Sequence, residues 1–381
     1  MVFNNSILLG AAGQSTGQAP FDPTLIGNSI WLDGSADFLS RQNGSDFANR
    51  KEVTLSFWVQ RNKFASQQAI FAGLEGGDGF IIQFMSGDTF QLHLNGSANL
   101  TTNAVFRDIG WYHILVSIDT SQALSTDRSK VYINGEQITS FSSAAYPTQN
   151  SNIPGISGQM TSTENMRIGN YNNAVSNFYF HKGYVTQACM IESKSIQQGD
   201  FAVSDFLDTF TFGTNGSQII PKKDSDIAAL ASAAGGNSFC LDFANSSDLG
   251  NDISSNNNDF TPTSMSSDNQ SGNTPSNSYP IWNPLEPTNS TLSFSEGNLR
   301  ATGSGGSDGG AIGTIPLPTS GTSEFQIKAN NGDGRVGIIA LDGAVGVDEP
   351  SNNCAGGVGL GFNAAYHYSE NGQVRKVISS G

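Results

Sequence analysis

Residues 107–119 read Arg-Asp-Ile-Gly-Trp-Tyr-His-Ile-Leu-Val-Ser-Ile-Asp, and residues 129–138 read Ser-Lys-Val-Tyr-Ile-Asn-Gly-Glu-Gln-Ile. Between Tyr112 and Ile118, every second residue is apolar and faces one side, while Trp111, His113, Leu115 and Ser117 face the other. This period of two predicts a half-buried β-strand. In the second stretch, Asn134-Gly135 supplies residue types that accept the positive φ angles of a tight turn. The two stretches therefore predict two strands and a hairpin.

Similar strand patterns recur along the first half of the chain, and about ten such segments are arranged most economically as two facing antiparallel sheets. The segments are residues 29–34, 37–39, 53–59, 69–72, 79–85, 90–94, 111–118, 130–133, 166–168 and 176–181. The first two are expected to form a hairpin-like pair interrupted by Gly34. Residues 185–198, with Thr186 as a candidate cap, are interpreted as a short helix or turn.

Five of these stretches, residues 54–59, 80–84, 110–116, 131–135 and 166–170, resemble in order and spacing the laminin G-like branch of the concanavalin A-like jelly rolls. The resemblance covers roughly residues 22–200. It implies an all-β fold, an antiparallel jelly-roll sandwich. Further stretches resemble a group of tailed-bacteriophage virion proteins, in which a laminin G-like domain is followed by a SPRY-like one: residues 1–14, 104–113, 148–150, 213–216, 252–262 and 274–277.

Four regions are expected along the chain. Residues 1–20 form an N-terminal arm that cannot build its own core, and residues 21–200 form the jelly roll. Residues 201–290 form an irregular connecting segment with one short helix over residues 224–236, where acidic residues precede an Ala-rich body and glycines follow; residues 239–243 are expected to form a strand. Residues 291–381 form a partial SPRY-like β unit, an incomplete second sandwich whose later strands are absent, so that the chain is a fragment or a shortened copy.

Composition narrows the classes of function. The 381 residues carry a formal net charge of −15, and only 13% of them are charged. Such a chain repels nucleic acids and anionic membrane surfaces, so neither is expected as a partner. No apolar run is long enough to span a membrane, and the N-terminus lacks a basic segment typical of secretion signals. The surface composition is nevertheless typical of extracellular proteins, which fits a virion assembled in the host cytoplasm and released by lysis.

Cysteine and acidic residues give little sign of a chemical site. Cys189, Cys240 and Cys354 form neither a metal-binding pair nor an even set, and are interpreted as buried free thiols. The acidic loop at residues 248–259 offers oxygen ligands of the kind that calcium prefers. Asn and Asp side chains bonding their own backbone are the favoured interpretation, and calcium stays open as the alternative. No cofactor is expected.

Catalysis is also not expected. A retaining glycosidase needs two carboxyl groups about 5 Å apart. No two Glu residues lie closer than ten positions in the sequence, although acids on different strands can still converge. Of the four isolated histidines, His93, His113, His181 and His367, His113 is interpreted as a hydrogen-bonded structural residue. We therefore predict no enzyme and name no catalytic, metal or receptor-binding residue.

Three functions remain. The first is a bacteriophage virion structural protein, such as a tail-fibre or receptor-binding component, whose loops recognise glycans or proteins of the host surface. The second is an architectural capsid decoration or tail adaptor protein that contacts other virion proteins through the arm; the lack of any shaft-forming repeat favours it. The third is a glycan depolymerase. A homo-oligomer is expected, with a trimer as the guess.

Overall fold

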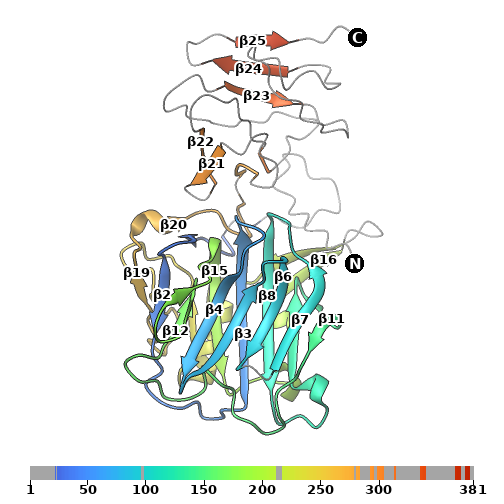
Figure 1. Cartoon of the computed structure of the whole chain (residues 1–381), viewed down its shortest axis with the longest axis vertical. Helices are drawn as coiled ribbons and strands as arrows, with labels where there is room; N and C mark the ends of the chain where they lie inside the picture. Colours follow the sequence, from blue (N-terminus) through green and yellow to red (C-terminus); the bar gives the residue numbers. More distant parts are fainter. Residues whose placement is uncertain are drawn as a thin grey trace. The chain divides into compact units, whose positions relative to one another are not determined.

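The computed structural model describes residues 22, 24–95, 98–211, 217–278, 280–283, 292–295, 298–303 and 313–314, and the backbone of 335–339, 365–369 and 374–377. The chain divides into two compact units, Met1–Tyr279 and Pro280–Gly381. The arm at residues 1–20 lies outside the described residues. Figure 1 shows that the described elements are almost all strands.

Two eight-stranded antiparallel sheets build the first unit. In sheet A the order is β10 (Glu136–Gln137), β9 (Ser129–Ile133), β8 (Trp111–Asp119), β3 (Glu52–Arg61), β15 (Lys182–Glu192), β1 (Ser29–Asp33) and β20 (Gln270–Ser271), with β18 (Phe239–Leu241) also paired to β15. In sheet B the order is β11 (Phe141–Ala144), β7 (Ala98–Val105), β6 (Thr89–Leu94), β5 (Asp78–Phe84), β4 (Gln68–Glu75), β12 (Met166–Ile168), β2 (Phe38–Arg41) and β19 (Thr261–Thr263).

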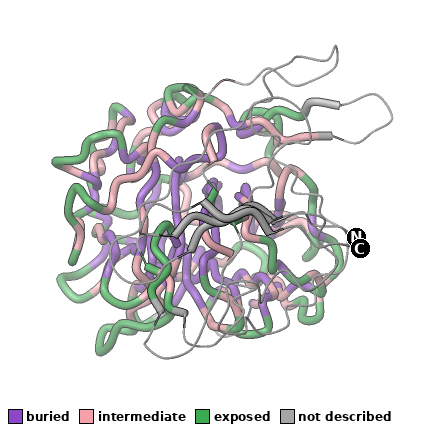
Figure 2. The backbone as a smooth tube through the Cα atoms, turned by 90° about the horizontal axis from the view of Figure 1, so that it is seen from above, coloured by how far each residue is buried: buried purple, intermediate pink, exposed green. Residues whose placement is uncertain are grey.

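The main core lies between these sheets. Alternating side chains of β3 and β8 face it from sheet A, and those of β4, β5 and β6 face it from sheet B. Phe57 of β3 meets Phe71 of β4 with ring centroids 5.6 Å apart, which joins the two layers. In Figure 2 the buried positions gather along the strands in the interior of this unit. The predicted all-β antiparallel sandwich is confirmed.

Sheet A is buried on its outer face as well, which the prediction of a half-buried strand missed. Every residue of β8 is buried. The helix α1 (Asp224–Ala234) packs Ile227 and Ala231 against Leu115 and Ile191. Trp58, Trp111 and Tyr184 form a second outer cluster against Ile219 of β17 (Ser217–Pro221), which pairs with β16 (Leu207–Thr211). The outer face is therefore a second core, to which α1 and β17, both after the predicted jelly roll, contribute.

Two local predictions were wrong. Residues 185–198 were interpreted as a helix or turn, but residues up to Glu192 belong to β15, the central strand beside β3, and only Ile196–Gln198 form a 3-10 turn, η2. A bulge with Gln187 at φ 44° interrupts the alternation that identifies a strand. The expected hairpin of residues 29–39 is also absent, because β1 and β2 lie in different sheets.

Other predictions hold. Asn134 and Gly135 have φ angles of 54° and 81° in the turn between β9 and β10. The helix and the strand β18 lie where the sequence placed them. Within residues 201–290, however, β18 pairs with β15, β19 with β2, and β20 with β1. Much of the expected connecting segment is thus integrated into the two sheets.

The remaining short strands are β13 (Tyr171–Asn172) and β14 (Asn177–Phe178) in the first unit, and two small sheets in the second. The second unit pairs β21 (Leu292–Ser295) with β22 (Arg300–Gly303), and β23 (Arg335–Ile339) with β24 (Ala365–Ser369) and β25 (Val374–Val377). These elements confirm β structure after residue 291. The rest of the predicted partial SPRY-like β unit lies outside the described residues.

Candidate functional site

A chain of side-chain hydrogen bonds crosses the outer face of sheet B. Gln67 Nε2 donates to Gln83 Oε1 at 2.9 Å, and Gln83 Nε2 donates to Gln91 Oε1 at 2.7 Å. Gln91 Nε2 then donates to the Thr101 hydroxyl at 2.8 Å. Each amide is held in one orientation because its nitrogen donates to the next side chain in the row. The Thr101 hydroxyl accepts a bond at its oxygen and can still donate its proton. The row is therefore a fixed set of neutral donors and acceptors.

His93 and Asn99 extend this row by one pair. They lie opposite each other on β6 and β7, and His93 Nδ1 is 2.6 Å from Asn99 Oδ1. Because an amide oxygen can only accept, the proton sits on Nδ1 in this pair. Both residues are partly exposed, and so are Gln91 and Thr101. Their polar groups can thus reach a ligand lying on the sheet.

An aromatic hairpin lies next to the polar row. The strands β13 and β14 pair Tyr171 with Phe178, and Tyr171 stacks on Tyr179 with a 6.1 Å centroid separation and an 11° angle between the rings. Phe178 and Tyr179 are 39% and 36% exposed. At the tip, the Asn173 carboxamide accepts bonds from the backbone of Val175 and Ser176, which stabilises the turn.

The position of Tyr171 follows from small residues beneath it. Its ring packs against Ala69, Ala72 and Ile81 on β4 and β5. A methyl group on Gly79 would lie 3.1 Å from the Tyr171 hydroxyl, so the missing side chain at this glycine leaves room for the ring. Ile81 is the register partner of His93, and Gln83 that of Gln91, so the aromatic and polar parts adjoin.

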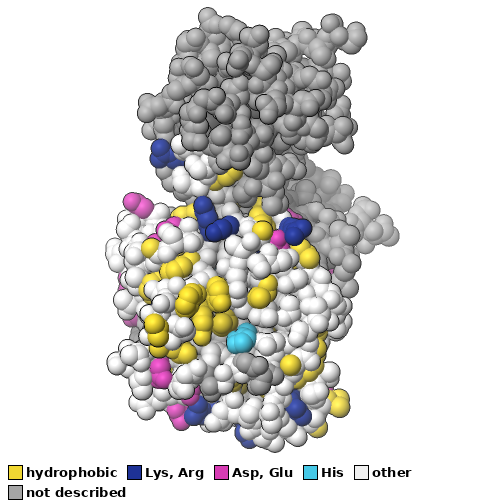
Figure 3. All heavy atoms as spheres, in the orientation of Figure 1, with side chains coloured by type: hydrophobic (Ala, Val, Ile, Leu, Met, Phe, Trp, Pro, Cys, Tyr) yellow, Lys and Arg dark blue, Asp and Glu magenta, His cyan; other side chains and the backbone are white. Residues whose placement is uncertain are grey.

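We call this surface the aromatic-amide face; it comprises Gln83, Gln91, His93, Asn99, Thr101, Tyr171, Phe178 and Tyr179. In Figure 3, hydrophobic side chains gather beside a histidine on the side of the first unit turned to the viewer, and the surrounding surface is mostly uncharged. Oriented amides beside exposed aromatic rings suit a hydroxyl-rich ligand. No residue of this face was identified in the sequence. The alternation of polar with apolar residues over residues 89–94 was the available signal.

The other described histidines are structural. His113 is fully buried, lies 2.9 Å through Nε2 from the Ser56 hydroxyl, and packs against Trp58. Burial lowers the pKa of His113 to about 3, so the ring is neutral at physiological pH. His181 is fully buried too, and burial lowers its pKa to about 3. The hydrogen-bonded structural histidine expected at position 113 is thus present.

Acids of neighbouring described strands do lie opposite each other: Glu75 and Asp78 at the turn between β4 and β5, and a second pair in sheet A. Glu52 and Asp119 are register partners on β3 and β8. Burial, and then the charge of Asp119, raises the pKa of Glu52. Burial also raises the pKa of Asp119, but bonds from Gln122, Ser121 and Gln198 outweigh this effect and lower it overall. Asp119 is fully buried, so a sugar cannot reach the pair, which argues for a structural role.

The acidic loop is organised by its own backbone. Asp252 accepts from the backbone N–H groups of Cys240, Ser254 and Asn258, and Asp259 accepts from that of Asp252. This is the favoured interpretation of residues 248–259. Within the described residues, no group of three or more His, Cys, Asp or Glu side chains could hold a metal ion.

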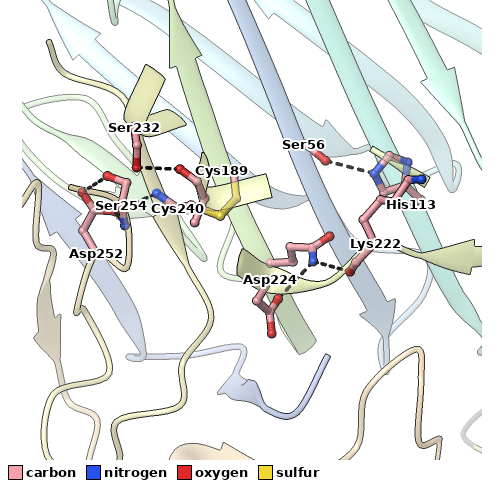
Figure 4. The surroundings of a disulfide bond; sticks show 11 residues. Ser56, His113, Cys189, Lys222, Asp224, Ser232, Cys240, Asp252 and Ser254 are labelled. Carbon is pink, nitrogen blue, oxygen red and sulfur yellow. Dashed lines mark hydrogen bonds between the residues drawn. A yellow bond between two sulfur atoms is a disulfide. The ribbon is translucent and has the colours of Figure 1, made fainter. Parts of the chain in front are cut away.

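The interpretation of Cys189 and Cys240 as free thiols was wrong. They are register partners on β15 and β18, and form a disulfide. Figure 4 shows it beside Ser232 of α1, with Asp252 and Ser254 nearby. The bond links the central strand of sheet A to the segment that covers it. Nothing in the sequence indicated this pair, because Cys354 makes the number of cysteines odd; Cys354 lies outside the described residues.

One shallow cavity of about 470 Å³ lies at the β19 edge of the first unit. Serine hydroxyls and a few apolar side chains line it: Ser246, Ser247, Leu249, Pro262, Met265, Ser266 and Ser267. Among the described residues, no helix has the length and apolar character needed to cross a bilayer.

The two sheets of the first unit form an antiparallel jelly-roll sandwich. Residues 33–180 match the family model of the Concanavalin A-like lectin/glucanases superfamily. This match supports the laminin G-like, concanavalin A-like jelly-roll domain that the sequence resemblance implied for this part of the chain. No curated protein sequence matches the chain.

Several solved structures are similar. One is a putative carbohydrate binding protein from Bacteroides ovatus, at 14% identity and a TM-score of 0.37, where the match covers 62% of this chain and 58% of that one. The chain thus spans a little over half of that structure's length. Another is the SAP-like pentraxin from Limulus polyphemus, at 14% identity and a TM-score of 0.35, covering 53% and 97%. A third is the LG1-3 region of the laminin alpha2 chain, at 14% identity and a TM-score of 0.31, covering 43% and 31%.

Proposed function

We propose that this protein is a bacteriophage virion component that recognises glycans of the host surface through its laminin G-like domain. The observation that carries the glycan part is the aromatic-amide face, where the stacked Tyr171 and Tyr179 adjoin the oriented amide of Gln91. The apolar face of a pyranose ring packs on aromatic rings, while its hydroxyls exchange hydrogen bonds with amides. The virion part is supported by the resemblance of the sequence stretches named above.

The rigidity of this face favours recognition over catalysis. Its polar groups hold one another in place on paired strands, so little conformational entropy is lost when a ligand binds. The face lacks an acid pair among its defining residues, and the buried Glu52 and Asp119 belong to sheet A. We therefore propose a binding protein and not a depolymerase. Release of reducing sugar from host polysaccharide would contradict this part.

The test is binding of the purified protein to a glycan array and to host cells. Replacing Tyr179 by alanine removes one stacked ring and is expected to weaken glycan binding by about tenfold. The matched control is Leu124→Ala, which removes an apolar side chain of 67% exposure in the loop before the 3-10 helix η1 (Ser125–Asp127), away from this face. Equal binding by both variants and the wild type would contradict the proposal.

A purely architectural role is the second candidate. Val175, at the tip of the hairpin, is 87% exposed, and an apolar side chain so placed can also anchor a protein partner. Electron microscopy of the intact particle separates the two roles, since a place in the capsid lattice excludes the fibre role. The same maps count copies per particle and test the homotrimer that we propose.

A further inference from the structure

A buried arginine lies at the border of the aromatic-amide face. Arg167 of β12 is only 8% exposed. Its strand neighbours Met166 and Ile168 face the core, so Arg167 faces outward. Its register partner on β4 is Ala72, one of the residues on which Tyr171 packs. The guanidinium and the aromatic hairpin are therefore immediate neighbours on one surface.

The partners of this guanidinium are all neutral. Nε donates to Asn165 Oδ1 at 2.5 Å, and Nη1 donates to Asn177 Oδ1 at 2.6 Å. The carbon Cζ lies 4.4 Å from the centroid of the Phe38 ring, which covers one flat side of the group. Among the described residues, no carboxylate lies within 4.0 Å of Arg167, and Nη2 has no hydrogen-bond partner.

Three other arginines, unlike Arg167, have acidic neighbours. Arg61 pairs with Asp88, and Arg50 with Glu75. Arg41 lies in the field of Asp252, Glu192 and Asp259. Arg167 lacks such a neighbour in a chain with 33 acidic residues, and burial lowers its pKa to about 10. A buried cation without an opposite charge is costly, and it binds an incoming anion strongly.

We propose that Arg167 is the anion-binding point of a subsite for a carboxylate-bearing sugar. This inference rests on the glycan-binding function proposed above and narrows its ligand to acidic glycans. The carboxylate accepts hydrogen bonds from Nη2 and Nη1 along the edge of the guanidinium. The exposed Asn177 carboxamide lies beside it, and the sugar ring rests on Phe178 and Tyr179, which follow Asn177 in the hairpin.

The test compares each acid with its own neutral form. The probes are an oligogalacturonate and sialyllactose, each as the free acid and as the carboxyl methyl ester, measured by calorimetry on the full chain. The acid is expected to bind about 10 to 100 times more tightly than its ester for at least one of them. The two acids distinguish uronates from nine-carbon sugar acids as the source of the carboxylate.

Variants then assign the effect to Arg167. In Arg167→Gln the preference for the acid is expected to disappear, whereas binding of the ester stays within about twofold. Arg167→Lys should retain only part of the preference, because an ammonium group lacks the planar fork. Arg128→Gln is the control, since that guanidinium also bonds only neutral oxygens, the backbone carbonyls of Gln122, Ala123 and Pro147.

Each outcome decides the inference. Esters that bind the wild type as tightly as the acids overturn it and leave the proposed glycan binding intact. Equal loss of acid and ester binding in Arg167→Gln shows that Arg167 only holds the hairpin, and also overturns it. If that variant does not fold, the acid-to-ester ratio of the wild type decides alone. Binding of no probe in either form contradicts the proposed function itself.

Discussion

Replacing Asp88 by asparagine isolates the charge of one buried carboxylate. Asp88 lies in the turn between β5 and β6 with φ 60°, a conformation that asparagine also tolerates. The side chain is 1% exposed. It accepts from Arg61 Nη2 at 3.0 Å, Arg107 Nε at 2.8 Å and the backbone N–H of Ala65 at 2.8 Å. An asparagine keeps one acceptor oxygen and removes the negative charge.

The magnitude follows from Arg61, which is fully buried. Its guanidinium also donates to the carbonyl of Phe106 at 2.6 Å and lies 4.3 Å from the centroid of the Phe84 ring, so it cannot turn toward water. Removing one partner of a buried ion pair leaves the other charge uncompensated and costs about 3–5 kcal/mol. We therefore expect Asp88→Asn to lower the free energy of unfolding by about that amount at pH 7.

Urea denaturation followed by tryptophan fluorescence measures this change, because Trp58 and Trp111 are buried in the same unit. The control is Asp208→Asn, whose carboxylate is 53% exposed and pairs with Lys222 at 2.6 Å. An exposed pair of this kind contributes less than about 1 kcal/mol. A loss below about 1 kcal/mol for Asp88→Asn, equal to that of the control, would refute the reasoning.

Three further predictions concern pH and redox state. Burial raises the pKa of Asp224 to about 7 despite a bond from Gln187, so the folded state retains a proton that the unfolded state releases near pH 4. The free energy of unfolding therefore falls as pH rises from about 4 to 7, and at pH 8 urea denaturation of Asp224→Asn should give a value about 1–3 kcal/mol above that of the wild type. Burial lowers the pKa of His113 to about 3, so the unfolded state binds a proton near pH 6.5 that the folded state does not. Stability is therefore lost as pH falls from about 6.5 toward 3, and the free energy of unfolding of His113→Gln should fall less between pH 7 and pH 5 than that of the wild type. Reduction of the Cys189–Cys240 bond, which spans a sequence separation of 51 residues, should lower the free energy of unfolding by about 2–4 kcal/mol. In the control variant Cys240→Ser, which lacks the bond, reductant should leave the free energy of unfolding unchanged.

The sandwich could be predicted because the alternation of apolar and polar residues within a single strand is visible in the sequence. In β3 and β8 the alternation of apolar side chains identifies the inner face directly, and Asn134-Gly135 identifies the turn. In β15 the bulge at Gln187 breaks this alternation, so this internal strand of sheet A was missed. The outer core at Trp58 and Trp111 was also missed, since it depends on contacts with residues distant in sequence, such as Tyr184 and Ile219.

The candidate site was less predictable for a related reason. Gln83 and Gln91 are ordinary surface residues in sequence, and only the register of β5 and β6 places their amides within hydrogen-bonding distance. Tyr179 lies in a stretch expected to be a plain strand, residues 176–181, and Tyr171 lies before it, outside the predicted strands, whereas the structure pairs these segments as a hairpin. Arg167 shows no signal at all, because the absence of acids around it is a property of the folded surface.

Because Ser29 in β1 pairs with Ser271 in β20, strands far apart in the sequence must both be synthesised before sheet A is complete. Sheet A cannot be completed until the ribosome has passed residue 271, although β3 has been made by residue 61. At about 5–20 residues per second, the roughly 210 intervening residues take on the order of 10–40 s. During that time the backbone of β1 lacks its β20 partner, a period in which chaperones can hold the nascent chain and neighbouring chains can pair with this open edge.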